Sequence, residues 1–133
     1  MIVECGVAII RKGSRVLIAQ RRADDTLGSF WEFPGGKKED AETLAACVER
    51  EVAEELGVRV AVGRAFMDVK KRYKGRTIHL NFFLCEHLAG EPRTLDCQRA
   101  LWVEMGDLPN YKFPPANKPV IEQLLGRRPE GRH

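Results

Sequence analysis

Acidic residues crowd into one short stretch of the chain, EREVAEELGV. It contains Glu49, Glu51, Glu54 and Glu55, with Arg50 among them. Like charges one helical turn apart repel each other, so surface helices usually intersperse acids with bases. The stretch is therefore either a solvated face neutralised by neighbouring bases, or a place that receives something strongly positive.

The same region has the periodicity of an amphipathic helix. Apolar side chains recur at every fourth position, at Leu44, Val48, Val52 and Leu56. Such spacing places them in one stripe along a helix. Thr43 is a suitable N-cap and Gly57 a suitable residue to end the helix. We therefore predict a helix from about Leu44 to Leu56.

At about 100° per residue, the carboxylates of Glu51, Glu54 and Glu55 fall on one arc that adjoins the apolar stripe. Charged carboxylates at the edge of a core are unfavourable unless a cation accompanies them. Hard oxygen ligands suit Mg²⁺ or Mn²⁺, and Mg²⁺ commonly bridges carboxylates to substrate phosphates. Helix geometry alone leaves two readings open, metal binding or neutralisation by bases such as Arg50 and Arg59.

The flanking segments predict the elements that hold this helix. VECGVAII and VLIAQ are β-branched segments around a Gly13–Ser14 turn, which predicts a hairpin. Further on, VRVAVGRAFMDVKKRY and TIHLNFFLCEHL predict strands joined around Lys74–Gly75, ALWVEM predicts another strand, and VIEQLL a short helix with Pro119 near its first turn. Because strands and helices do not alternate strictly, we expect an α+β fold with a mixed sheet sandwiched between α-helices.

Size and composition indicate one domain. The chain has 133 residues, of which 44% are hydrophobic and 31% charged, a balance typical of globular proteins. We predict a single domain over residues 1–126 and a disordered basic tail at residues 127–133. The net charge of +3 favours an anionic ligand without requiring a nucleic-acid polymer.

The remaining composition bears on compartment. The four cysteines lack metal-binding spacing, so we expect free thiols in a reducing compartment: Cys5, Cys47, Cys85 and Cys97. The N-terminus does not resemble a signal peptide, and no run approaches the ~20 apolar residues of a membrane span. We expect a cytoplasmic protein that does not bind membranes.

The full spacing around the acidic helix is highly specific. Residues Gly36 to Val58 fit the pattern G-x5-E-x7-R-E-U-x-E-E-x-G-U, where U is a bulky aliphatic residue. Every fixed position matches: Gly36, Glu42, Arg50, Glu51, Val52, Glu54, Glu55, Gly57 and Val58. This resembles the Nudix box of the Nudix hydrolase family.

The resemblance implies a Nudix fold and hydrolysis of a nucleoside diphosphate linked to another group, with Mg²⁺ as cofactor and Mn²⁺ as a substitute. It implies catalytic roles for Arg50, Glu51 and Glu54, with Glu51 acting as metal ligand or as the base that activates water. Arg50 and Glu42 would orient the acids. The implied metal ligands are the Gly35 carbonyl and the carboxylates of Glu51, Glu54, Glu55 and Asp96.

Two further segments, RRADD…WEFPGGK and FPPANKPV, are similar to the MutT-type 8-oxo-dGTP pyrophosphohydrolases of this family. The similarity implies that Asn117 reads the edge of an oxidised purine and that Arg22 and Phe33 contribute to the nucleotide pocket. Asp96 stands where a Glu is typical, which shortens its reach. A nucleoside triphosphate is the expected partner of a monomeric enzyme.

Several alternatives stay open. The LW-EF-like approach to the box also resembles pyrophosphohydrolases of CTP or modified dCTP, and Nudix-like domains also occur as non-catalytic binding modules. Asn117 precedes a helix and is also a candidate N-cap. We interpret His79 as structural, and the basic cluster from Lys70 to Arg76 as a solvated hairpin tip in preference to a phosphate site.

Overall fold

The centre of the fold is β1 (Ile2–Lys12), a long strand with neighbours on both sides. The computed structural model describes residues 1–126, so the tail predicted at residues 127–133 lies outside the described residues. β1 pairs antiparallel with β2 (Arg15–Gln20) and parallel with β6 (Arg76–Ala89). β6 in turn pairs antiparallel with β5 (Arg59–Tyr73). The sheet is therefore mixed, as predicted.

Three further strands complete a seven-stranded sheet. β3 (Trp31–Glu32) and β7 (Arg99–Glu104) pair with β2, and β4 (Gly35–Lys37) pairs with β1. A Cβ atom on Gly35 would lie 2.2 Å from the carbonyl oxygen of Gly6 on β1. Glycine is therefore needed here, because it lets β4 lie directly against β1.

The acidic helix is α1 (Leu44–Leu56), with the bounds that its periodicity predicts. Thr43 Oγ1 accepts a hydrogen bond from the Ala46 amide at 3.1 Å, which caps the first turn. Gly57 ends the helix in the left-handed conformation, at φ +67°. Both predicted caps are confirmed.

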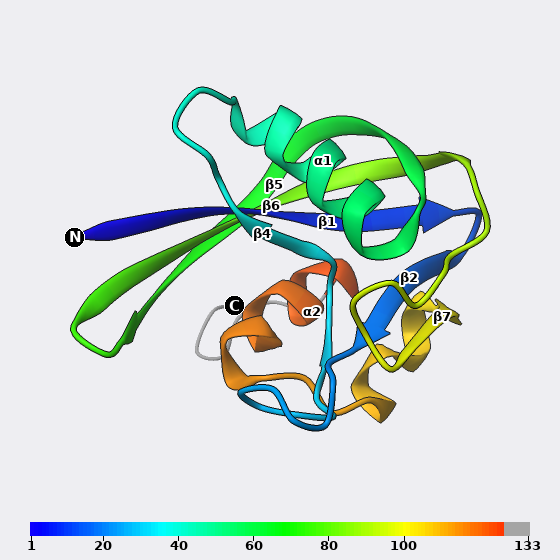
Figure 1. Ribbon diagram of the computed structural model, residues 1–133. Coiled ribbons are helices and arrows are strands. Elements are labelled where there is room, and N and C mark those ends of the chain that lie inside the picture. Colours follow the sequence, from blue (N-terminus) through cyan, green and yellow to red (C-terminus); the bar gives the residue numbers. More distant parts are fainter. Residues whose placement is uncertain (127–133) are drawn as a thin grey trace.

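Two hydrophobic clusters fill the two faces of the sheet, because side chains alternate along each strand. On β1, Val7 and Ile9 face one cluster, and Ala8 and Ile10 face the other. The second cluster contains Val48, Val52 and Leu56 of the apolar stripe of α1. The first contains Val120 of the short helix α2 (Lys118–Leu124). Figure 1 shows α1 and α2 on opposite sides of the sheet, which confirms the predicted sandwich.

The connection between β7 and α2 contains two 3-10 helices, η1 (Met105–Asn110) and η2 (Pro115–Asn117). The sequence patterns did not predict η1. It is anchored by Leu108, which is fully buried in the same cluster as Val120. All four cysteines are free thiols, as expected.

Candidate active site

Arg50 lies at the centre of a hydrogen-bond network that joins α1 to the loop before it. Its guanidinium binds both carboxylate oxygens of Glu42, with Nη2–Oε1 at 2.6 Å and Nε–Oε2 at 3.0 Å. Its Nη1 donates to Glu51 Oε2 at 2.9 Å and to Glu54 Oε1 at 3.1 Å. A fork-shaped donor that binds several carboxylates fixes their positions as well as their charge.

Glu42 anchors this network to the loop before α1. The hydrogen bond from Arg50, with a further bond from the Glu39 amide, lowers the pKa of Glu42 to about 2. Arg50 Nη2 also donates to the carbonyl oxygen of Lys37 on β4 at 3.1 Å. Arg50 therefore ties the loop, the strand and the helix together.

Glu51 and Glu55 lie where α1 meets the β3–β4 segment. A Cβ atom on Gly36 would lie 2.5 Å from the Glu51 carboxyl carbon, so a side chain at position 36 would displace the Glu51 carboxylate from this position. Glu55 accepts a hydrogen bond from the Gly35 amide at 3.3 Å. Burial raises the pKa of Glu55 far above its usual range, and a hydrogen bond with Glu51 adds to the shift.

A loop brings Asp96 to the same end of α1. The Leu95 amide donates to the Glu55 carbonyl oxygen at 3.2 Å, and the charge of Asp96 contributes to raising the pKa of Glu32, after the larger effect of burial. Arg22 Nη1 lies 3.8 Å from Asp96 Oδ1, and both side chains are mostly exposed. The structure thus places Arg22 beside Asp96 rather than inside the cavity described next.

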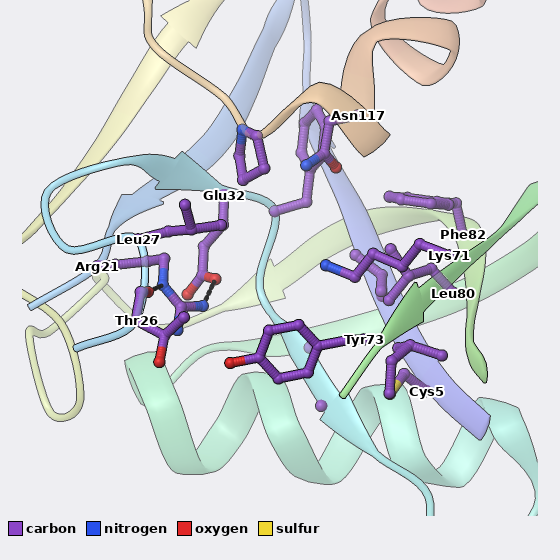
Figure 2. Close-up of a pocket in the computed structure, with 16 residues that line it drawn as sticks. Cys5, Arg21, Thr26, Leu27, Glu32, Lys71, Tyr73, Leu80, Phe82 and Asn117 are labelled. Atoms are coloured by element: carbon purple, nitrogen blue, oxygen red, sulfur yellow. Dashed lines mark hydrogen bonds and ion pairs between the residues drawn. The ribbon is translucent and has the colours of Figure 1, made fainter. Parts of the chain in front are cut away.

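A cavity of about 530 Å³ opens beside this carboxylate cluster. Gly35 and Gly36 line its end near α1, and Phe33 and Asn117 line it from the β3–β4 segment and from η2. Figure 2 shows lining residues from elements far apart in the sequence, among them Cys5, Tyr73 and Asn117. The volume suits a ligand of nucleoside size.

Asn117 is 8% exposed and lines the cavity. It stands at the N-cap position of α2, yet its side chain makes no capping hydrogen bond. The geometry therefore favours the ligand-reading interpretation of Asn117 over the alternative that it serves as a helix cap.

This chain is similar to known proteins over most of its length. A family model described as NUDIX domain matches residues 6–123. The chain belongs to the Nudix family. It is 37% identical to the 8-oxo-dGTP diphosphatase of Escherichia coli K12, over 91% of this chain and 95% of the relative. It is 31% identical to the CTP pyrophosphohydrolase of the same strain, over 95% of this chain and 93% of the relative.

A solved structure shows the same fold. The solution structure of the E. coli ORF135 protein superposes with a TM-score of 0.85 at 30% identity, covering 94% of this chain and 89% of that protein. Nudix hydrolases act on nucleotide substrates and use divalent metal ions. Among the described residues, no helix is both long and apolar enough to cross a membrane.

The Nudix residues of this chain fit a divalent cation by their chemistry. The side chains of Glu51 and Glu55 lie together beside the Gly35–Gly36 backbone, and their carboxyl groups supply hard oxygen ligands. Within residues 1–126, no three His, Cys, Asp or Glu side chains are already gathered as a metal site. Glu51 and Glu54 are instead turned towards Arg50, which supplies the positive charge in this arrangement.

Two features of the cavity did not follow from the sequence spacing. Arg21, rather than Arg22, lines the Nudix cavity. The basic cluster from Lys70 to Arg76 is only partly a solvated tip, because Lys71 and Tyr73 also line the cavity. The alternation of side chains along β5 could have indicated this, since Lys71 and Tyr73 are two positions apart and share one face of the strand.

Proposed function

We propose that this Nudix hydrolase converts nucleoside triphosphates to the monophosphate and pyrophosphate with Mg²⁺, for which Mn²⁺ can substitute. We propose 8-oxo-dGTP as the preferred substrate, so that the enzyme removes an oxidised, mutagenic precursor from the nucleotide pool. One observation carries the proposal. The uncapped amide of Asn117 lines the same cavity as Gly35 and Gly36, next to the Nudix carboxylates.

The chain's own residues would divide the work between two ends of the site. At the α1 end, the carboxylates of Glu51, Glu54, Glu55 and Asp96 and the Gly35 carbonyl would hold the cation. Arg50, with Glu42, would hold Glu51 and Glu54 in position. When bound, a divalent cation neutralises polyphosphate charge and makes a neighbouring water more acidic.

Within that frame, Glu51 is suited to accept the proton of the attacking water. Its side chain is largely buried, only 16% exposed, and Arg50 fixes its orientation. At the other end, Phe33 gives an apolar wall and Asn117 offers both donors and an acceptor to a purine edge. Arg22, exposed beside Asp96, is placed to meet phosphate at the rim.

The second candidate is hydrolysis of CTP or a modified dCTP by the same residues. The similarity to the E. coli CTP pyrophosphohydrolase, over 95% of this chain, favours it. It differs from the first only in the base that the cavity accepts. A non-catalytic module is disfavoured, because every acid of the Nudix box is present.

A substrate panel separates these candidates. Purified protein with Mg²⁺ is given 8-oxo-dGTP, dGTP, CTP, dCTP and 5-methyl-dCTP at low micromolar concentration, and the products are resolved by chromatography. We expect the highest kcat/KM on 8-oxo-dGTP, with monophosphate and pyrophosphate as products. A preference for cytidine nucleotides would support the second candidate, and no turnover of any triphosphate would refute both.

A further inference from the structure

Two cationic side chains line the cavity in the described part of the chain, and they differ in what they already bind. The Arg21 guanidinium donates to Glu32 Oε1 at 2.8 Å and to the Thr26 carbonyl oxygen at 2.7 Å, and it lies 3.1 Å from Asp25 Oδ2. Its charge and donors are therefore largely used within the protein. Arg21 and Glu32 together form a neutralised, hydrogen-bonded wall.

Lys71 is different. Within residues 1–126, its amino group forms no hydrogen bond, ion pair or aromatic contact, although the side chain is partly buried. Figure 2 shows it extending from β5 into the cavity, with Asn117 on one side and Tyr73 on the other. No other protein group uses the three donors of this ammonium among the described residues, so they are available to a ligand in the cavity.

The register of the β5–β6 hairpin fixes this direction. Lys71 stands opposite Ile78, and Val69 opposite Leu80. Ile78 and Leu80 also line the cavity, so this face of the hairpin forms one wall of it. The neighbouring Lys70 stands opposite His79 on the other face, and its side chain is exposed.

The surroundings of Lys71 suit a base rather than a phosphate. Its amino group has no carboxylate of the Nudix box within ion-pair distance among the described residues. Its cavity neighbours Leu80 and Phe82 are apolar, as expected of walls that receive a flat aromatic ring.

Asn117 alone does not determine whether the edge of the bound base must present hydrogen-bond donors or acceptors. An amide carries donors on one side and an acceptor on the other, and it can present either after a half-turn. A lysine has three donors and no acceptor. A second group of fixed polarity would therefore decide which bases satisfy the cavity.

We propose that Lys71 is a specificity-determining residue that donates a hydrogen bond to a carbonyl oxygen of the purine base. The proposal rests on the function proposed above, and it adds that the β5–β6 hairpin, not only the segment around Asn117, reads the base. A purine without a carbonyl would leave the Lys71 donors unsatisfied and bind less well.

The test measures binding of monophosphates by calorimetry, so that it does not depend on turnover. The probes are 8-oxo-dGMP, dGMP, which lacks the 8-carbonyl, and 2-aminopurine deoxyribose monophosphate, which lacks both carbonyls. Each is measured with wild type, Lys71→Met and the matched control Lys70→Met. Lys71→Met should weaken 8-oxo-dGMP binding about ten- to a hundredfold, as for a hydrogen bond from a charged group.

The same variant should change 2-aminopurine binding by less than about threefold, because that base offers no carbonyl to lose. Lys70→Met should leave all three affinities unchanged. A loss equal on all three probes would overturn the proposal and assign Lys71 to the phosphate. Unchanged binding of 8-oxo-dGMP would also overturn it.

Folding and function are checked separately. Thermal melting shows whether Lys71→Met folds, and Lys71→Gln replaces it if it does not. If wild type binds 8-oxo-dGMP but hydrolyses none of the triphosphates in the panel, the proposed function fails while the Lys71 comparison still decides this inference.

Discussion

The two ends of the site are built in opposite ways. At the α1 end, five charged side chains from one short stretch bind one another: Glu42, Arg50, Glu51, Glu54 and Glu55. At the other end, the cavity has mostly apolar walls from segments spread between Cys5 and Asn117, and a few polar groups that point inward. At the α1 end the charged groups bind one another, whereas in the cavity Arg21 and Glu32 are paired but the Lys71 ammonium is left for a ligand.

The difference separates reaction from recognition. A dense network resists change, because removing one member leaves buried partners without their bonds. An isolated polar residue in an apolar cavity can be substituted without disturbing its neighbours, and each substitution alters which ligand the cavity binds. We therefore expect changes at the α1 end to affect turnover of all substrates, and changes in the cavity to affect the ratio between substrates.

Removal of divalent cations should have the largest effect. Excess EDTA should reduce hydrolysis of every triphosphate below detection, because the cation is expected to neutralise the polyphosphate beside the Nudix carboxylates. Mg²⁺ or Mn²⁺ added beyond the chelator should restore the rate. The rates are followed by pyrophosphate release, and activity that survives chelation would contradict a metal-dependent α1 end.

Glu51→Gln should come next. We expect kcat to fall about 10²- to 10⁴-fold on all substrates, since the amide cannot accept the proton from water. The melting temperature should stay near that of wild type. Glu49→Gln is the matched control, because Glu49 is exposed on the same helix and should leave kcat unchanged. If Glu51→Gln lowered kcat for some substrates much more than for others, the assignment of turnover to the α1 end and of discrimination to the cavity would be contradicted.

Asn117→Ala should act chiefly on discrimination. We expect kcat/KM for 8-oxo-dGTP to fall about tenfold to a hundredfold, with a smaller loss for dGTP, because the amide reads the base edge. Asn110→Ala, at an exposed position on η1, serves as control. Equal losses on both nucleotides, together with a lower melting temperature, would assign Asn117 to a structural role.

His79 gives the smallest effect, and it concerns stability alone. Its Nε2 lies 2.6 Å from Asp68 Oδ2 and its Nδ1 lies 2.9 Å from Glu4 Oε1, on the face of the hairpin opposite Lys71. Hydrogen bonds that the His79 ring donates to Asp68 and then to Glu4 raise the pKa of His79 above its ordinary value of 6.5. The folded protein thus holds this proton more tightly than the unfolded chain does.

The stabilisation from His79 is therefore fully present below pH 6.5 and disappears as the pH rises through the folded-state pKa. The pKa values of Glu4 and Asp68 are lowered, so their contribution disappears only in acid. Wild type should melt above His79→Gln at pH 5.5, and the difference should shrink at pH 9. A difference that grows with pH would contradict this sign, and base discrimination should not change.

The two ends also differ in how far the sequence predicts them. The α1 end is local: the four-residue apolar period, Thr43 and Gly57 predict the helix with its bounds, and the Nudix spacing identifies its acids. The cavity is not local, because Lys71 and Tyr73 reach it only through the pairing of β5 with β6 and of β6 with β1. Sequence spacing also could not separate Arg21 from Arg22, since their directions depend on Glu32 and on the loop around Thr26.

The parallel pairing of β1 with β6 has a consequence for biosynthesis. Ile2 pairs with Thr77 and Arg11 with Glu86, so each partner of β1 lies 75 residues downstream. At about 5–20 residues per second, the ribosome needs roughly 4–15 s to supply that partner after β1 has been made. During this interval β1 can form its hairpin with β2, but one edge of an apolar strand stays open to other chains. The nascent chain is therefore most prone to aggregation after the β1–β2 hairpin has formed and before β6 has been synthesised.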